Sequence, residues 1–574
     1  MTNFNVVEKS IAELRAALES GAVTSVQLVE QYLDRIERYD QNGIKLNSIV
    51  ELNPHALDEA AASDARRASG ALLGALDGIP FTAKDSYMVE GMTVAAGSPA
   101  FANLRASKNA FSIQALKDVG AIFIGLTNMP PMANGGMQRG LYGRAESPYN
   151  GDYLTSAFGS GSSNGSGTAT AASFAAFGLG EETWSSGRAP AACNGLCAYT
   201  PSRGLISTRG NWPLVPTMDV VVPHTRSMAD MAELLDVLIA GDADSTGDLW
   251  RMQSWVKIPK PSEFKKGSLV AEFESARDEV ARESKPLAGV RLAAPKMFLG
   301  RDEAQGSGTG MGSVTGEKIS PRASSMVLWN ALVEKLTAAG AEVVETDFPV
   351  VTNYEADRAG VPNVFNRGIV PSEFFDFEIW DLSIWSWNAF LENNAQKDLS
   401  HITEVDGENI FPHPSGALRD WYAEFDFDPA DYVKRAREVG VIDPFDSKHA
   451  DLLQAGLEAL ESTRKVDLDD WLIENRFAAV IFPTLADVAP ADADVNPASA
   501  DIAWQNGVWV ANGNLAIRHL GVPTVTVPLG TVADIGMPFG LTIAGGAYQD
   551  LELLGLAAKI EAISPARTAP TRTP

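Results

Sequence analysis

Short apolar runs alternate with amphipathic segments along most of the chain. Apolar runs of strand length occur at residues 121–125, 290–294 and 480–482, while residues 112–119 and 228–238 carry apolar side chains at helical spacing. Alternation of strands and helices is typical of α/β proteins. The pattern therefore predicts an α/β fold with a central, largely parallel or mixed β-sheet flanked by helices.

The N-terminal part is expected to be mostly helical. Apolar residues recur every three to four positions between Leu28 and Ile36, and Thr24 with Gln27 forms a capping-box pattern before them. A second helix, rich in alanine and charged residues, is predicted over residues 54–69. The sequence GALDGIPFTAKDS, residues 74–86, then indicates a strand bounded by glycine and proline.

The region between residues 301 and 480 differs from the rest in composition. It opens with a Gly/Ser-rich loop, residues 302–320, that matches neither a Walker A motif nor a dinucleotide-binding motif. Aromatic residues then gather between about residues 350 and 390. Two interpretations stay open: an insertion with its own small core, or a cap whose aromatic side chains line a substrate pocket. We expect one large domain with a core of residues 1–300, a mainly helical insertion at 301–480, and a second part of the core at 481–565.

Composition narrows the classes of partner. The chain has 574 residues, 45% of them hydrophobic, a formal net charge of −27 and a pI of about 4.6. Such a negative field repels nucleic-acid phosphates, and no basic run extends beyond Lys265-Lys266. The sequence contains no run of 18 apolar residues and no apolar signal core, so we expect no membrane span and a cytoplasmic location.

Neither a metal site nor a cofactor is expected. The six histidines are scattered without the spacing of metal ligands. Cys193 and Cys197 lie in an apolar, alanine-rich segment, so we expect both to be small core residues.

Residues 159–190 hold the strongest candidate chemistry. Two serine clusters, Ser162-Ser163 and Ser185-Ser186, flank a segment of small residues that predicts a short buried helix and a strand. Glycine-rich turns are costly to order, and they suit sites where backbone N–H groups point at developing charge. A flexible linker is disfavoured because residues 169–179 are largely apolar.

One interpretation of this segment is a nucleophile elbow. Gly161 to Gly165 match the pattern G-x-S-x-G of α/β-hydrolases, which would make Ser163 the nucleophile. That scheme needs Asp and His partners later in the chain, and His519 is the candidate near a late turn. The pattern is short, and a Gly/Ser-rich segment matches it by chance.

A second interpretation accounts for more of the chain. The sequences G-x-P-x-x-x-K-D at residues 78–85, S-G-S-S-N-G-S at 160–166 and G-E-E-T-W-S-S-G-R-A-P at 180–190 resemble the amidase signature family. The family's two serine motifs read approximately G-G-S-S-G-G-S and G-T-D-T-G-G-S-I-R-I-P, and its two active serines are 24 residues apart, as are Ser162 and Ser186. Matches at residues 125–129 and 514–528 extend the similarity, whereas the region 300–480 is hard to match.

The resemblance implies an amidase-signature-like domain with a Ser–cisSer–Lys triad. Ser186 would attack the carbonyl carbon of an amide. Ser162, beside a non-proline cis peptide bond, would relay the proton to Lys84, the general base and later acid. The resemblance also implies an oxyanion hole, formed by the backbone N–H groups of Thr183, Trp184, Ser185 and Ser186. It further implies substrate contacts at Ala133, Gly161 and Ser163.

Lys84 must be neutral to accept a proton. In water the lysine pKa is about 10.4, so the amine is charged at neutral pH. Burial without a carboxylate partner lowers this pKa. Asp85 follows directly in the sequence, and strand alternation is expected to turn its carboxylate away from the amine.

The chain departs from the family pattern beside the predicted nucleophile. Trp184-Ser185 stands where the family has Gly-Gly, and Glu182 where it has Asp. A tryptophan restricts φ and adds bulk, so the pocket is reshaped or the site is weakened. The presence of the three triad residues favours an active enzyme, with Arg188 bracing the loop.

The leading hypothesis is a metal-independent hydrolase that cleaves the C–N bond of a carboxamide, anilide or carbamate. Its partner would be a small-molecule amide, and esters would also react. One alternative is the glutaminase subunit of a tRNA-dependent amidotransferase, which the acidity disfavours. Another is a catalytically weakened binding homologue, motivated by Trp184-Ser185. A homodimer is compatible with the family resemblance.

Overall fold

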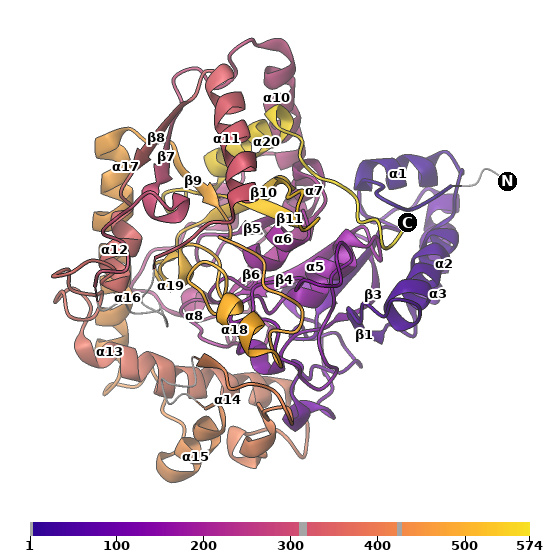
Figure 1. Ribbon diagram of the computed structural model, residues 1–574. Helices are drawn as coiled ribbons and strands as arrows, with labels where there is room; N and C mark the ends of the chain where they lie inside the picture. Colours follow the sequence, from indigo (N-terminus) through magenta and orange to yellow (C-terminus); the bar gives the residue numbers. More distant parts are fainter. Residues whose placement is uncertain (1–3, 309–317, 422–427) are drawn as a thin grey trace.

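One mixed β-sheet runs through the whole molecule. The computed structural model describes residues 4–308, 318–421 and 428–574. Its sheet has eleven strands in the order β1-β3-β2-β4-β6-β5-β10-β11-β9-β7-β8 (Figure 1). The strands are β1 Ile49–Leu52, β2 Pro80–Lys84, β3 Ile122–Thr127, β4 Phe177–Glu182, β5 Cys197–Thr200, β6 Val220–Thr225, β7 Arg291–Pro295, β8 Glu342–Thr346, β9 Ala479–Pro483, β10 Thr524–Thr531 and β11 Pro538–Ala544.

The strand directions confirm the mixed form of the predicted sheet. β2 pairs in parallel with both β3 and β4, and β7 pairs in parallel with both β8 and β9. Every other neighbouring pair in the order is antiparallel. The alternative of a largely parallel sheet is therefore wrong.

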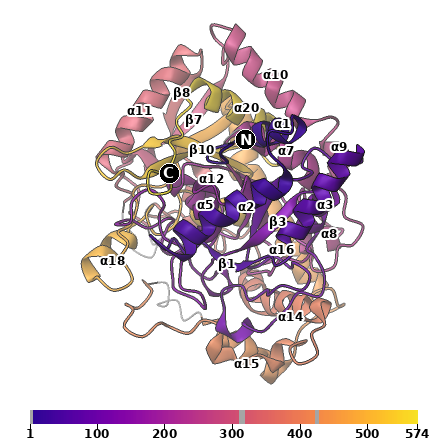
Figure 2. The same cartoon turned by 90° about the vertical axis from the view of Figure 1, so that its right-hand side faces the viewer.

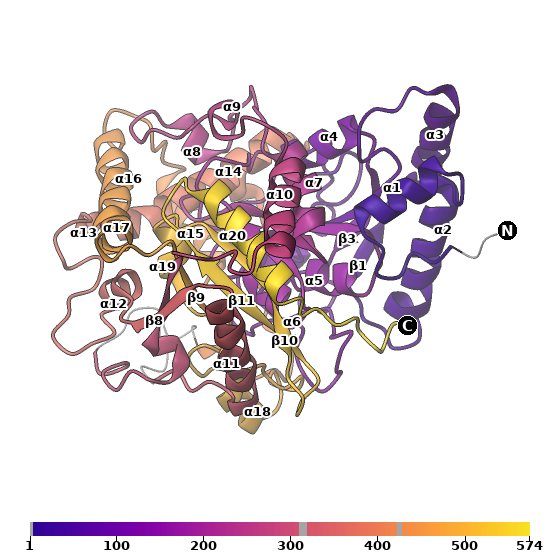
Figure 3. The same cartoon turned by 90° about the horizontal axis from the view of Figure 1, so that it is seen from above.

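Helices surround the sheet. α1 to α3 gather at the β1 end and form the near surface in Figure 2, whereas α10, α20 and α7 pack together, as the view from above shows (Figure 3). The helices are α1 Ile11–Glu19, α2 Ser25–Arg35, α3 Ala56–Ser69, α4 Phe111–Asp118, α5 Asn164–Ala171, α6 Arg188–Cys193, α7 Met228–Leu238, α8 Leu249–Met252, α9 Pro261–Phe264, α10 Leu269–Arg282, α11 Ala323–Ala338, α12 Pro349–Glu355, α13 Ser372–Asp376, α14 Ser383–Asn394, α15 Ala430–Val439, α16 Ala450–Arg464, α17 Asp470–Asn475, α18 Pro497–Ala503, α19 Asn514–His519 and α20 Asp550–Ile563.

The periodic segments form the predicted elements. α2 begins after Thr24, whose side chain accepts from the Gln27 N–H while Gln27 bonds back to the Thr24 N–H, as the capping box predicts. α3, α4, α7 and the strands β2, β3, β7 and β9 lie where the hydrophobic pattern placed them. Cys193 and Cys197 are free, buried residues.

The region 301–480 is joined to the main sheet instead of standing apart. Its strand β8 extends the sheet next to β7. Two of its aromatic residues pack against Trp212, which lies in the predicted N-terminal core. The Phe390 ring stacks on the Trp212 ring with 4.0 Å between centroids, and the Trp387 ring meets the Trp212 ring edge-on at 5.8 Å. These rings therefore belong to a shared core, not to a core of their own. The predicted boundaries at 301 and 481 stay predictions, and residues 309–317 of the Gly/Ser-rich loop lie outside the described residues.

The segment after the first serine cluster forms the predicted short helix and strand. α5 and β4 are buried along their full lengths. A Cβ atom at Gly178 would lie 2.7 Å from the Ser166 hydroxyl and 2.6 Å from that of Thr170, so glycine permits this close approach of α5 to the sheet. Among the described residues, no helix is long and apolar enough to cross a membrane.

Candidate active site

Three segments bring Lys84, Ser162 and Ser186 to one edge of the sheet. Lys84 is the last residue of β2, Ser162 lies in the turn before α5, and Ser186 lies in the turn between β4 and α6. Because β2 and β4 are parallel neighbours, their carboxyl ends meet at the same edge, where α/β proteins commonly place ligands. Lys84 and Ser162 are fully buried, and Ser186 is 3% exposed.

Lys84 contacts Ser162 directly. The Lys84 Nζ donates to the Ser162 Oγ over 2.6 Å, and the Ser163 N–H donates to the Ser186 carbonyl oxygen over 3.2 Å. Within the described part of the chain, the Ser186 hydroxyl forms no hydrogen bond, so the predicted Ser162–Ser186 contact is not made in this structure. There is also no cis peptide bond among these residues. The bond before Ser162 is therefore trans in this structure, contrary to the family-based expectation.

A carboxylate lies beside the Lys84 amine, which the sequence did not lead us to expect. Glu181 Oε1 is 3.2 Å from Lys84 Nζ, whereas Asp85 turns away and accepts from the Gly97 N–H. Burial lowers the pKa of Lys84 below its ordinary value, and the negative charge of Glu181 acts in the opposite direction. The expectation of a buried lysine without a carboxylate partner is therefore wrong, although the prediction for Asp85 is confirmed.

The turn that carries Ser186 is held from two sides. The Ser185 N–H donates to the Ser160 Oγ over 3.1 Å, and the Ser185 Oγ donates to the Ser160 carbonyl oxygen and accepts from the Ala511 N–H. The Ser185 N–H is thus engaged in this state and not free to bind an oxyanion. The N–H groups of Thr183, Trp184 and Ser186 have no acceptor among the described residues, so these predicted donors remain available.

Glu182 and Arg188 brace the same turn from inside. Both side chains are fully buried and form an ion pair. The Glu182 carboxylate accepts from the N–H groups of Gly187 and Arg188, and the guanidinium donates to the carbonyl oxygens of Trp184 and Asn514. Arg188 thus contacts carboxylate and carbonyl groups, as predicted.

The three predicted substrate contacts fall into two groups. Ala133 has a φ of 57° in a loop whose Gly136 packs against the backbone of Gly161, so both positions border the serine turn. Ser163 differs, because its hydroxyl donates to the Glu181 carbonyl oxygen and accepts from the Glu181 N–H. This hydroxyl holds β4 in place and is not free to bind a substrate.

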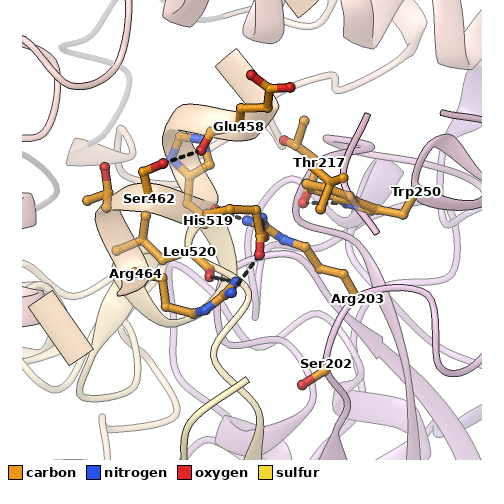
Figure 4. Close-up of polar contacts among 12 residues, drawn as sticks. Ser202, Arg203, Thr217, Trp250, Glu458, Ser462, Arg464, His519 and Leu520 are labelled. Atoms are coloured by element: carbon orange, nitrogen blue, oxygen red, sulfur yellow. Dashed lines mark hydrogen bonds and ion pairs between the residues drawn. The ribbon is translucent and has the colours of Figure 1, made fainter. Parts of the chain in front are cut away.

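The nucleophile-elbow interpretation finds no support. His519 lies away from Ser163: its Nδ1 is 2.7 Å from the Tyr354 hydroxyl and its Nε2 is 3.0 Å from Glu378. Figure 4 shows its surroundings, where its carbonyl oxygen accepts from Arg203 and the Leu520 carbonyl oxygen accepts from Arg464. His519 is therefore part of a buried structural network.

Sequence reasoning missed two further residues at the site. His224 Nδ1 lies 3.0 Å from the Ser166 hydroxyl and its Nε2 lies 2.9 Å from the Gly187 carbonyl oxygen, and burial lowers its pKa to about 4. The Trp509 carbonyl oxygen accepts hydrogen bonds from the N–H groups of Gly159 and Ser160. The Trp509 ring meets the Trp184 ring edge-on, with 6.3 Å between centroids. No local motif marks either residue.

Lys84, Ser162 and Ser186 all lie in a part of the chain that matches a known family. Residues 27–280 match the model of the family described as Amidase. These residues belong to the amidase family.

Two relatives illustrate the likeness in sequence. The chain is 34% identical over 298 residues to a component of the glutamyl-tRNA(Gln) amidotransferase of Aromatoleum aromaticum, covering 51% of this chain and 55% of the relative. It is 32% identical over 293 residues to the indoleacetamide hydrolase of Bradyrhizobium diazoefficiens, covering 50% and 53%. The matches thus span little more than half the length of these relatives.

Solved structures show the same fold over nearly the whole chain. The peptide amidase of Stenotrophomonas maltophilia superposes with a TM-score of 0.70 at 24% identity, covering 98% of both chains. An amidase family protein from Bacillus anthracis gives a TM-score of 0.70 at 21% identity, covering 99% of this chain and 93% of the other.

Proposed function

We propose that this protein is an amidase that hydrolyses the C–N bond of a carboxamide, anilide or carbamate through an acyl-enzyme on Ser186. In this proposal Ser162 relays a proton from Ser186 to Lys84, which later returns it to the departing amine. The observation that carries the proposal is the 2.6 Å contact of a fully buried lysine with Ser162, on the turn whose backbone bonds the Ser186 carbonyl oxygen.

The chemistry suits the geometry. Burial lowers the pKa of Lys84, which makes a neutral amine available at lower pH than in water. The free N–H groups of Thr183, Trp184 and Ser186 can bind the oxygen of a tetrahedral intermediate, and losing one such donor typically costs about a hundred- to a thousandfold in rate. In this structure no hydrogen bond joins the Ser186 hydroxyl to Ser162 among the described residues, so the relay requires that contact to form.

Covalent labelling tests the assignment. A fluorophosphonate probe should modify Ser186, and mass spectrometry should locate the adduct. Labelling should vanish in Ser186→Ala and fall steeply in Lys84→Ala, in parallel with turnover of a panel of aryl amides, among them indole-3-acetamide. An adduct on Ser163 would support the nucleophile-elbow interpretation instead. No labelling together with no turnover would favour a binding homologue.

A second candidate is the glutaminase component of an amidotransferase. It is favoured by the 34% identity to the relative from Aromatoleum aromaticum. Glutamine hydrolysis that requires copurifying partner proteins would support it. The net charge of −27 opposes close contact with tRNA.

A further inference from the structure

Glu181 occupies a position that the proposed mechanism leaves without a role. It stands in the second motif where the similar family has threonine, and it is the last but one residue of β4. Its Oε1 lies 3.2 Å from Lys84 Nζ, on the amine that also contacts Ser162. In the described part of the chain, this is the ion pair that Lys84 forms.

Hydrogen bonds hold Glu181 in place through both its backbone and its carboxylate. The backbone of Glu181 is bonded on both sides to the Ser163 hydroxyl, and its Oε2 accepts from the Asn211 side chain over 3.3 Å. Ala83 pairs with Leu179 in the parallel pair β2–β4, so Lys84 and Glu181 both lie at the carboxyl ends of two neighbouring strands.

Glu181 also connects the buried amine with the surface. Lys84 is completely buried, whereas Glu181 is 8% exposed and lines a small cavity together with Asn211, Trp212 and Asp219. Glu181 therefore contacts both the buried amine and this cavity.

The other titratable groups around the amine are held by different partners. Glu182 is paired with Arg188, and Asp219, whose pKa is raised by burial to about 7, accepts from the Thr183 hydroxyl. Burial lowers the pKa of His224, on β6, to about 4. Tyr87, which follows β2, donates its hydroxyl to the Gly180 carbonyl oxygen, and Asp85 accepts from the Gly97 N–H.

We propose that Glu181 is a positioning residue that holds the Lys84 amine against Ser162 and sets the pH at which Lys84 becomes a base. An adjacent carboxylate favours the charged form of the amine, so it delays the appearance of the neutral base on raising the pH. Two protons move in succession: the ammonium of Lys84 releases one through Glu181 to solvent, and the neutral amine then accepts a second, from the Ser186 hydroxyl, by way of Ser162. The inference rests on the proposed role of Lys84.

The test is the pH profile of kcat/KM on an aryl amide for Glu181→Gln, Glu181→Asp and Asp219→Asn. The acid limb is the low-pH side of this profile, where kcat/KM rises as Lys84 loses its proton. Glu181→Gln should move this limb to lower pH by about one unit or more, because an opposite charge at this distance shifts a pKa by about 1–3 units. Glu181→Asp keeps the charge and should restore the wild-type limb. Asp219→Asn removes a carboxylate from the same cavity that does not touch Lys84, so its shift should be clearly smaller.

Two results would overturn the inference. One is an acid limb that stays in place in Glu181→Gln. The other is a uniform fall of kcat/KM at every pH, which a merely structural role would give. The rate of fluorophosphonate labelling of Ser186, followed over the same pH range, separates this failure from that of the proposed function. A labelled wild type with an unmoved limb refutes the role of Glu181 alone, whereas a wild type that is never labelled refutes both.

Discussion

The hydrogen bond between the Ser185 N–H and Ser160 allows a direct test of the oxyanion hole. In Ser160→Ala the acceptor is lost, while the bonds of the Ser160 backbone to Trp509 and to the Ser185 hydroxyl remain. The Ser185 N–H is then free to turn to the substrate oxygen. We expect kcat for an aryl amide to increase.

The size of the increase follows from the bond that the wild type must break. A neutral hydrogen bond contributes a net of about 0.5–1.5 kcal/mol, and 1.36 kcal/mol corresponds to tenfold in rate. Loss of this bond from the ground state, with the transition state unchanged, should raise kcat about two- to tenfold. The same loss should lower the free energy of unfolding by up to about 1.5 kcal/mol.

Single-turnover and steady-state kinetics of the purified variant would measure this effect, and urea denaturation would measure the stability. Ser156→Ala is the matched control, because Ser156 is a nearby buried serine whose hydroxyl has no hydrogen-bond partner. It should leave kcat as it is. An unchanged or lower kcat in Ser160→Ala, with the control unaffected, would refute a role of the Ser185 N–H in catalysis.

Three further predictions concern residues around the site. Lys84→Met should reduce kcat/KM at least a hundredfold. Because it leaves Glu181 without its ion-pair partner, it should also lower the free energy of unfolding by about 3–5 kcal/mol. Activity assays and urea denaturation measure the two effects, and a variant with wild-type kcat/KM would rule out Lys84 as the base. Asp85→Asn should gain stability relative to wild type as the pH rises from about 4 to about 7. Burial raises the pKa of Asp85 to about 7, so the ionised carboxylate penalises the folded state by up to about 4 kcal/mol above that pH. Thermal melting at several pH values measures the difference, and a difference that does not change with pH would contradict it. Gly161→Ala should destabilise the fold by about 1–3 kcal/mol, since its Cβ would lie 1.8 Å from the Ser156 hydroxyl. An unchanged melting temperature would contradict this, because it would mean that the loop rearranges without cost.

Local signals in the sequence were sufficient for the elements that carry the site. The capping box fixed the start of α2, and the apolar runs located β2 and β3. The contact of Lys84 with Ser162 was expected from the family resemblance and not from a local pattern, and the two side chains do meet.

Contacts between distant segments could not be predicted in this way. Glu181 and Lys84 are 97 positions apart, and their contact requires β2 and β4 to be neighbours in the sheet. The bond from Ser185 to Ser160 likewise depends on how two turns pack against each other, and the aromatic cluster at Trp212 joins helix α14 to the loop between β5 and β6. Such contacts come from tertiary packing and leave no periodic or local pattern.

The Trp184-Ser185 pair, where the chain leaves the family pattern, fits its backbone without strain. Neither residue has a positive φ, so the turn does not require glycine at these positions. The cost of the tryptophan side chain is offset by packing, since its ring meets Trp509 edge-on. The same segment of chain bonds both serine turns, through the Trp509 carbonyl oxygen to Ser160 and through the Ala511 N–H to Ser185. The substitution and the loop around Trp509 therefore form one unit, and a return to glycine at position 184 would remove a support of the turn without freeing a new backbone donor.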